Sequence, residues 1–190
     1  MLPFNIKKEE MRGLLQLFAL MLLCSLVLLS FAGCTKKDQT PKPVIRDGWI
    51  TDKANILSPA DKSRLSDSLA SYEKETCHQI LVLIVPTLAG ESMADLSQRT
   101  ATAWDIGQPG FGNGILLSIA MKEGSLRLET ASAFDWFIEQ GTSDRILKEV
   151  MVPFFKDKRF TAGIEQGLAE IMGAARLKVI PENHKPAVCR

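Results

Sequence analysis

The sequence has few of the residues on which several common functions depend. Its 190 residues include two histidines, His78 and His184, and four cysteines. Cys77-His78 has no second Cys/His cluster with which to share a zinc ion. The sequence also contains no phosphatase nucleophile signature. These absences exclude a Cys/His metal module and leave catalytic residues unidentified.

An excess of charge of one sign is missing as well. The chain carries 23 basic and 22 acidic residues. Residues 1–34 contain three basic and two acidic side chains, so the rest of the chain has 20 of each. A balanced domain has no electrostatic reason to bind nucleic acid, so this class of partner is excluded.

Residues 1–34 have the pattern of an export signal. Arg12 precedes an almost uninterrupted apolar run, residues 13–31, and the run ends in Phe31-Ala32-Gly33-Cys34. A basic start, an apolar centre and small residues at the cleavage point describe a secretory signal. The alternative is a transmembrane anchor, because the run is close to the length that spans a bilayer. Met11 is an alternative start of the chain.

The Ala-Gly-Cys ending resembles the bacterial lipobox, in which cleavage exposes the cysteine for acylation. Phe31 stands where a leucine is more usual. We therefore predict a lipoprotein that is attached to the membrane of the cell envelope through lipidated Cys34. Thr35 is not the aspartate associated with inner-membrane retention, which favours the periplasmic face of the outer membrane.

The segments on either side of the predicted domain lack the apolar residues needed to fold alone. Residues 35–48 are polar, lysine-bearing and interrupted by proline, and are interpreted as a tether. Residues 177–190 are interpreted as a flexible tail. This tail contains Cys189, so a disulfide with Cys77 and a free Cys77 both stay open.

Hydrophobic periodicity and helix caps predict an alternation of strands and helices between residues 49 and 176. Ser58 and Pro59 suit the start of a helix, and Ser92 suits the start of a second that runs to Trp104. Predicted strands cover residues 79–85, 115–121 and 125–130, and predicted later helices run from Thr142 or Ser143 to Pro153 and from Phe160 to Arg176. Strand, helix, strand at this spacing implies a right-handed parallel crossover, to which a hairpin adds an antiparallel strand. The fold class is α/β, a three-layer α/β/α sandwich with a mixed, mostly parallel sheet.

Four glycines, Gly107, Gly110, Gly112 and Gly114, punctuate the loop before residue 115. Nucleotide-binding fingerprints place their glycines after a strand and before a helix, whereas this loop follows a helix and precedes a strand. We instead expect a helix C-cap at Gly107 and a tight turn at Asn113-Gly114. The loop could still border a ligand site at the sheet end.

Three segments resemble the TPM domain family in order and spacing: ITDKANILS, SMADLSQRTATAWDIGQPGFGNGILLSIAMKEGSLRLET and VPFFKDKRFTAGIEQGL. The resemblance implies a single α/β domain over residues 49–176. It also implies divalent cation binding and acid phosphatase activity, which some members of the family have.

The resemblance carries one metal-binding set onto this chain, with departures. Asp52 matches the family pattern, Asp135 replaces a glutamate, and Gln140 replaces an aspartate. Asp144 offers another carboxylate one helical turn away. A hard divalent cation such as calcium or magnesium prefers several charged oxygen ligands, so these departures predict weak binding at most. The alternatives are that Asp52 caps a turn and that the other three form a polar helix start.

The predicted function is therefore a lipid-anchored module of the cell envelope that binds or assists an unidentified envelope protein. Weak calcium or magnesium binding accompanies this hypothesis. Two alternatives stay open: a metal-assisted acid phosphatase, and an assembly or repair factor for a membrane protein complex.

Overall fold

A computed structural model describes residues 41–108, 111–131 and 140–176. The predicted signal segment, Asp135 and the predicted tail lie outside these ranges. The chain divides into residues 1–42 and 43–190, and the second unit holds every helix and strand named below. None of the helices in the described ranges is long and apolar enough to cross a membrane.

Four strands form the central sheet in the order β1-β2-β3-β4. They are β1 (Ile50–Asp52), β2 (Gln79–Val85), β3 (Gly114–Ala120) and β4 (Ser125–Thr130). The pairs β1–β2 and β2–β3 are parallel, and β3–β4 is antiparallel, which confirms the mixed, mostly parallel sheet. β1 was not among the predicted strands, because three residues are too few to form a pattern; pairing with β2 defines this strand.

The sheet is buried at its centre and half-exposed at one edge. All residues of β2 and β3 are buried, as expected for near-continuous apolar strands between two helical layers. β4 is partly exposed along its whole length. Its leucines, Leu126 and Leu128, pack on one core, whereas Arg127 and Glu129 alternate with them and form an ion pair of 2.7 Å.

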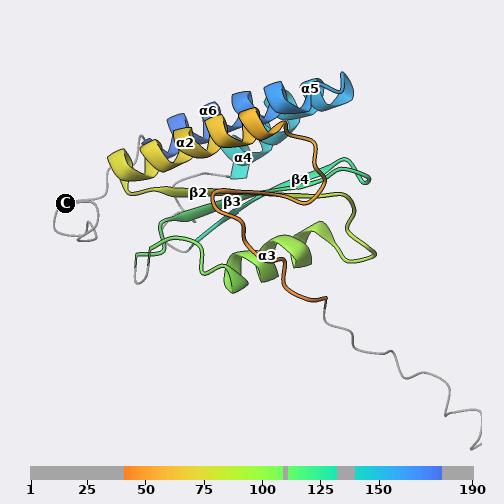
Figure 1. The fold of residues 1–190 in the computed structure, drawn as a ribbon, viewed down its shortest axis with the longest axis horizontal. Coiled ribbons are helices and arrows are strands. Elements are labelled where there is room, and N and C mark those ends of the chain that lie inside the picture. Colours follow the sequence, from red (N-terminus) through yellow and green to blue (C-terminus); the bar gives the residue numbers. More distant parts are fainter. Residues whose placement is uncertain (1–40, 109–110, 132–139, 177–190) are drawn as a thin grey trace, which may run out of the picture. The chain divides into compact units, whose positions relative to one another are not determined.

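Helices cover both faces of the sheet, which confirms the three-layer sandwich (Figure 1). The helices α2 (Pro59–Thr76) and α6 (Phe160–Arg176) lie over one face, and α3 (Met93–Ala103) lies over the other. Successive residues of β2 belong to different cores: Ile80 and Val82 to the first, Leu81 and Leu83 to the second. This period of two produces the two separate apolar cores.

Side-chain caps define the starts of α2 and α3. Ser58 Oγ accepts the Asp61 N–H at 3.0 Å, and Ser92 Oγ accepts the Asp95 N–H at 3.0 Å. Both caps satisfy backbone donors that a helix start leaves without partners, as predicted. α2 ends at buried Cys77, which has a left-handed backbone and is disulfide-bonded.

The helix that was predicted to end at Pro153 is longer and irregular. It begins at Gln140 as α4 (Gln140–Arg145), continues as the π-helix η2 (Ile146–Met151) and ends as α5 (Val152–Lys156). The Val152 N–H donates to Leu147 O, five residues back, and Pro153 follows at the start of α5. Pro153 has no backbone N–H to donate, so the regular helical ladder is interrupted where η2 passes into α5; Ile146 and Met151 are both buried in the first core.

Two glycines of α6 allow this irregular helix to approach closely. A Cβ at Gly163 would lie 2.9 Å from Phe154 Cβ and 2.9 Å from the Phe155 ring, and a Cβ at Gly167 would meet the Met151 side chain. The rest of the buried face of α6 is apolar, as predicted. The buried residues of both cores lie between Ile50 and Ala175, within the unit that begins at residue 43.

Candidate functional site

Asp52 ends β1 and holds the turn that leads to α2. Its Oδ1 accepts the Ala54 N–H at 3.0 Å, and its Oδ2 accepts the Leu57 N–H at 2.9 Å. Both carboxylate oxygens therefore stabilise backbone donors of the turn. This arrangement is the capping role that the sequence offered as the alternative to a metal ligand.

The other predicted metal ligands have no shared location in the described ranges. Asp144 is exposed on α4 and pairs with Lys148 Nζ at 2.9 Å, one helical turn away. Gln140 is the first residue of α4, and its side chain is not described. Asp135 lies outside the described residues. The described part of the chain contains no group of three or more histidine, cysteine, aspartate or glutamate residues that could hold a metal ion.

Strand register separates Asp52 from the strand end that precedes Asp135. Asp52 pairs with Ile84 and Ile84 with Ile119, whereas Thr130 pairs with Ile115 at the other end of β3. Thr130 thus lies about 13 Å along the strands and about 14 Å across them from Asp52. Convergence of Asp52 and Asp135 would require the four residues between Thr130 and Asp135 to return across most of the sheet. The four-residue metal site stays a prediction.

The glycine loop has a structural role that involves buried polar contacts. Asn113 is 1% exposed; its Nδ2 donates to Cys77 O, and its Oδ1 accepts the Gln108 N–H at 2.7 Å. Gln79 Oε1 accepts the Gly107 N–H at 2.9 Å. These bonds hold the loop against the start of β2 and β3.

Gly107 and Gly114 are needed because their backbones touch. A Cβ at Gly107 would lie 2.8 Å from Gly114 N, and a Cβ at Gly114 would overlap the backbone of Ile106 and Gly107. The C-cap of α3 is Trp104, so the predicted C-cap at Gly107 is wrong; Gly107 has a φ of +98° and serves this close contact instead.

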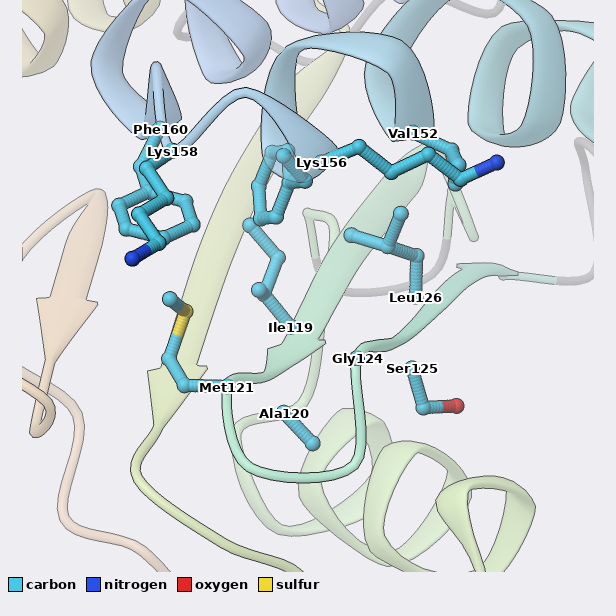
Figure 2. A pocket seen from close by; sticks show the side chains of 11 residues that line it. Ile119, Ala120, Met121, Gly124, Ser125, Leu126, Val152, Lys156, Lys158 and Phe160 are labelled. Carbon is cyan, nitrogen blue, oxygen red and sulfur yellow. The ribbon is translucent and has the colours of Figure 1, made fainter.

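A pocket of about 360 Å³ lies at the far end of the β3–β4 hairpin, under α5 and the start of α6 (Figure 2). Its size is at the lower end of the range of roughly 300–1,000 Å³ typical of small-molecule sites. Most of the lining is apolar, and the residues are Ile119, Ala120, Met121, Gly124, Ser125, Leu126, Val152, Phe155, Lys156, Lys158 and Phe160. We call this the hairpin pocket.

Two lysines border the hairpin pocket, and its described lining residues include no aspartate or glutamate. Lys156 and Lys158 are both exposed, and neither forms an ion pair with a described residue. Lys158 has a left-handed backbone, φ +57°, at the turn that joins α5 to α6. Figure 2 places the two ammonium groups on opposite sides of Ile119.

Acidic residues occur near the hairpin pocket but outside its lining. Thr87 Oγ1 donates to Glu123 Oε1 at 2.7 Å, and this hydrogen bond lowers the pKa of Glu123. The Glu123 carboxylate is thus bound to Thr87, in the loop that follows β2. Asp157 is exposed between the two lysines. Arg159 adds a further positive charge, with its guanidinium 4.9 Å from the centre of the Phe154 ring.

A second pocket, of about 420 Å³, lies between α3 and the end of β4. Its described lining includes two acidic residues, Asp105 and Glu129, and Glu129 is paired with Arg127. The remaining described lining residues are Gln98, Ala101, Thr102, Ile106, Thr130 and Ala131. Two carboxylates, one of them already paired with an arginine, make a poorer binding site than the apolar hairpin pocket, whose two lysines have no ion-pair partner among the described residues.

The hairpin pocket was not predicted from the sequence. The local signal is the run Phe154-Phe155-Lys156-Asp157-Lys158, in which lysines follow two aromatics that need burial. The hairpin turn that completes the pocket lies about thirty residues earlier. Only the fold brings the two segments together.

Comparison with known proteins identifies the family. Residues 50–174 match the TPM domain. The comparison with curated proteins gives no match.

Solved structures with the same fold include the following three. The N-terminal domain of a protein from P. gingivalis has a TM-score of 0.62 and 22% identity, over 67% of this chain and 81% of that one. The BA42 protein of Bizionia argentinensis has a TM-score of 0.58 and 15% identity, over 69% and 90%. The N-terminal domain of the cg2496 protein of Corynebacterium glutamicum has a TM-score of 0.53 and 14% identity, over 76% and 94%.

At these identities the solved structures establish the fold, and the family match extends over most of the chain. The residue pattern, the sheet order and the position of the helices agree with it. The chain belongs to the TPM domain family.

Proposed function

We propose that this chain is a lipid-anchored module of the cell envelope whose TPM domain binds another molecule and does not hydrolyse phosphate esters. The observation that carries the proposal is the hairpin pocket, an apolar cavity with two exposed lysines and no acidic residue among the residues described in its lining. Such a cavity suits binding, because apolar surface supplies affinity and a few polar groups supply orientation.

The partners of the family-derived carboxylates support binding over hydrolysis. Phosphoryl transfer needs metal ions or cationic groups aimed at the transferred phosphate, together with a positioned nucleophile. Asp52 is occupied by two backbone N–H groups, and Asp144 by Lys148. A cation at either carboxylate would have to share the oxygens with these donors.

Purified residues 35–190 test the choice between binding and catalysis. We expect no hydrolysis of a generic phosphomonoester above the blank, across acidic to neutral pH and with calcium, magnesium or manganese. We also expect the same thermal midpoint with and without calcium. Metal-dependent turnover that is lost in Asp135→Ala, with the thermal midpoint unchanged, would overturn the proposal in favour of a phosphatase.

The anchor is tested separately in cells with the full chain. Cys34→Ser should abolish incorporation of a labelled fatty acid and release the protein from the membrane fraction. Cys24→Ser, a change within the same leader, is the matched control and should keep the label. Retention of the label in Cys34→Ser would contradict the proposed lipid site.

A further inference from the structure

We propose that the hairpin pocket binds a small amphipathic anion, a molecule with one short alkyl chain and one carboxylate. This inference rests on the proposed binding function and names its ligand class. The apolar lining, the two lysines and the packing of the aromatic wall of the pocket support it.

The floor of the pocket is suited to an alkyl group. Ile119 and Ala120 are almost fully buried at the end of β3, and Leu126 and Phe155 are half-buried beside them. Water in such a cavity finds few hydrogen-bond partners, since Ser125 supplies the one side-chain hydroxyl among the described lining residues. An alkyl chain that displaces this water removes apolar surface from solvent, which favours binding.

The border of the pocket selects for negative charge. Lys156 and Lys158 approach the cavity from two sides, and both lack an ion-pair partner among the described residues. A lysine carries its ammonium on a flexible four-carbon chain, so either group can turn over the mouth toward a ligand carboxylate. A cationic ligand would meet two like charges there.

The pocket is a built feature of the fold. Gly163 lets Phe155 pack against α6, and Phe155 meets Phe160 edge-on, with ring centres 5.4 Å apart. The mouth is open at Gly124, where an added Cβ would meet no atom within 4 Å. Aromatic rings held in this way give a wall of fixed shape, which lowers the entropic cost of binding.

Titration of residues 35–190 with decanoate, kept below its critical micelle concentration and followed by amide chemical shifts, tests the proposal. We expect saturable shifts at Met121, Gly124 and Lys156. Decanol should bind more weakly, and decyltrimethylammonium should not bind at this site. Lys156→Glu and Lys158→Glu should each weaken decanoate binding roughly threefold, and the double variant roughly tenfold, because exposed charge contacts are individually small.

Two variants separate the pocket from general effects. Lys74→Glu changes an exposed lysine at the far end of α2 and should leave decanoate affinity unchanged. Val152→Trp fills the cavity without a change of charge and should weaken both decanoate and decanol, with a wild-type spectrum elsewhere.

Any of three results would overturn the proposal. The first is chemical shift changes that do not saturate or do not map to the pocket, and the second is equal binding of decanol and decanoate with no effect of the lysine variants. The third is binding to anionic vesicles but not to monomeric decanoate. The last result would indicate a membrane-docking face in place of a ligand site. Phosphatase turnover in the same sample would contradict the proposed binding function. If neither turnover nor decanoate binding is seen, only the proposed ligand class, an amphipathic carboxylate, is contradicted.

Discussion

At the scale of single residues, the buried polar groups are the places where this fold is most sensitive to its conditions. Tyr72 is 3% exposed, and its hydroxyl donates to Met172 O at 2.9 Å and contacts His78 Nδ1 at 3.3 Å. Burial raises the pKa of Tyr72 from 10.0 to about 12. Tyr72 is also the single tyrosine of the chain, so its titration can be observed directly.

The raised pKa predicts a loss of stability at alkaline pH. Between pH 10 and pH 12 the unfolded chain releases the Tyr72 proton while the folded chain keeps it, so the free energy of unfolding falls as pH rises. The stabilisation is complete below pH 10, and the loss should reach about 2 kcal/mol at pH 12. Phenolate absorbance should show one transition near pH 12 in the folded protein.

Tyr72→Phe provides the control for the lysines that titrate in the same window. It should cost about 1 kcal/mol at neutral pH through the lost hydrogen bond, and it should flatten the alkaline decline. An equally steep decline in this variant would mean that Tyr72 is not its cause.

A second buried hydroxyl lowers stability at all pH values. Thr100 Oγ1 is buried on α3 and has no hydrogen-bond partner among the described residues. Thr100→Val replaces the hydroxyl with a methyl group of similar size and should raise the free energy of unfolding by about 1 kcal/mol. The comparison variant is Ser97→Ala, which breaks the 3.0 Å bond to Ser118 and should lower it by a similar amount. Urea unfolding measures both, and a destabilised Thr100→Val would show that this hydroxyl is hydrogen-bonded in solution.

At the scale of elements, regular segments could be predicted and the irregular ones could not. The ends of β2, β4 and α6 follow from local signals. A buried apolar run, a hairpin turn and an apolar stripe at helical spacing are each contained in a short stretch of sequence. β1 depends on pairing with β2, and η2 depends on packing against Gly167. The hairpin pocket combines two segments far apart in sequence, so no local pattern could reveal it.

Gly114, at the end of the glycine loop, has no space for a side chain. Gly114→Ala puts a Cβ into backbone that cannot move without the loss of β3, so it should cost about 3–5 kcal/mol or prevent folding. Gly173→Ala is the matched change at an exposed site of α6 with no atom within 4 Å of the new Cβ. It should raise stability by about 0.5–1 kcal/mol through helix propensity. A Gly114→Ala variant as stable as the wild type would mean that the two backbones do not touch in solution.

At the scale of the whole molecule, the folded unit begins before its first strand. Trp104 Nε1 donates to Val44 O at 2.7 Å, Lys62 pairs with Asp47 at 2.6 Å, and the Asp47 N–H donates to Thr51 Oγ1 at 2.8 Å. Residues 44–47 were predicted as the end of the tether, yet they contact the domain. The predicted free tether is correspondingly short.

This attachment predicts the pattern of limited proteolysis. Trypsin should cut residues 35–190 after Lys36 or Lys37, in the polar part of the predicted tether, and should spare Arg46 while residues 44–47 stay in contact with α3 and α2. Trp104→Phe removes the bond to Val44 and should make Arg46 the next cleavage site, detected as a new fragment that begins at Asp47. Thr102→Ala, an exposed change on the same helix, should leave the pattern unchanged. Rapid cleavage at Arg46 in the wild type would place the start of the folded unit later than the structure does, at Gly48 or beyond.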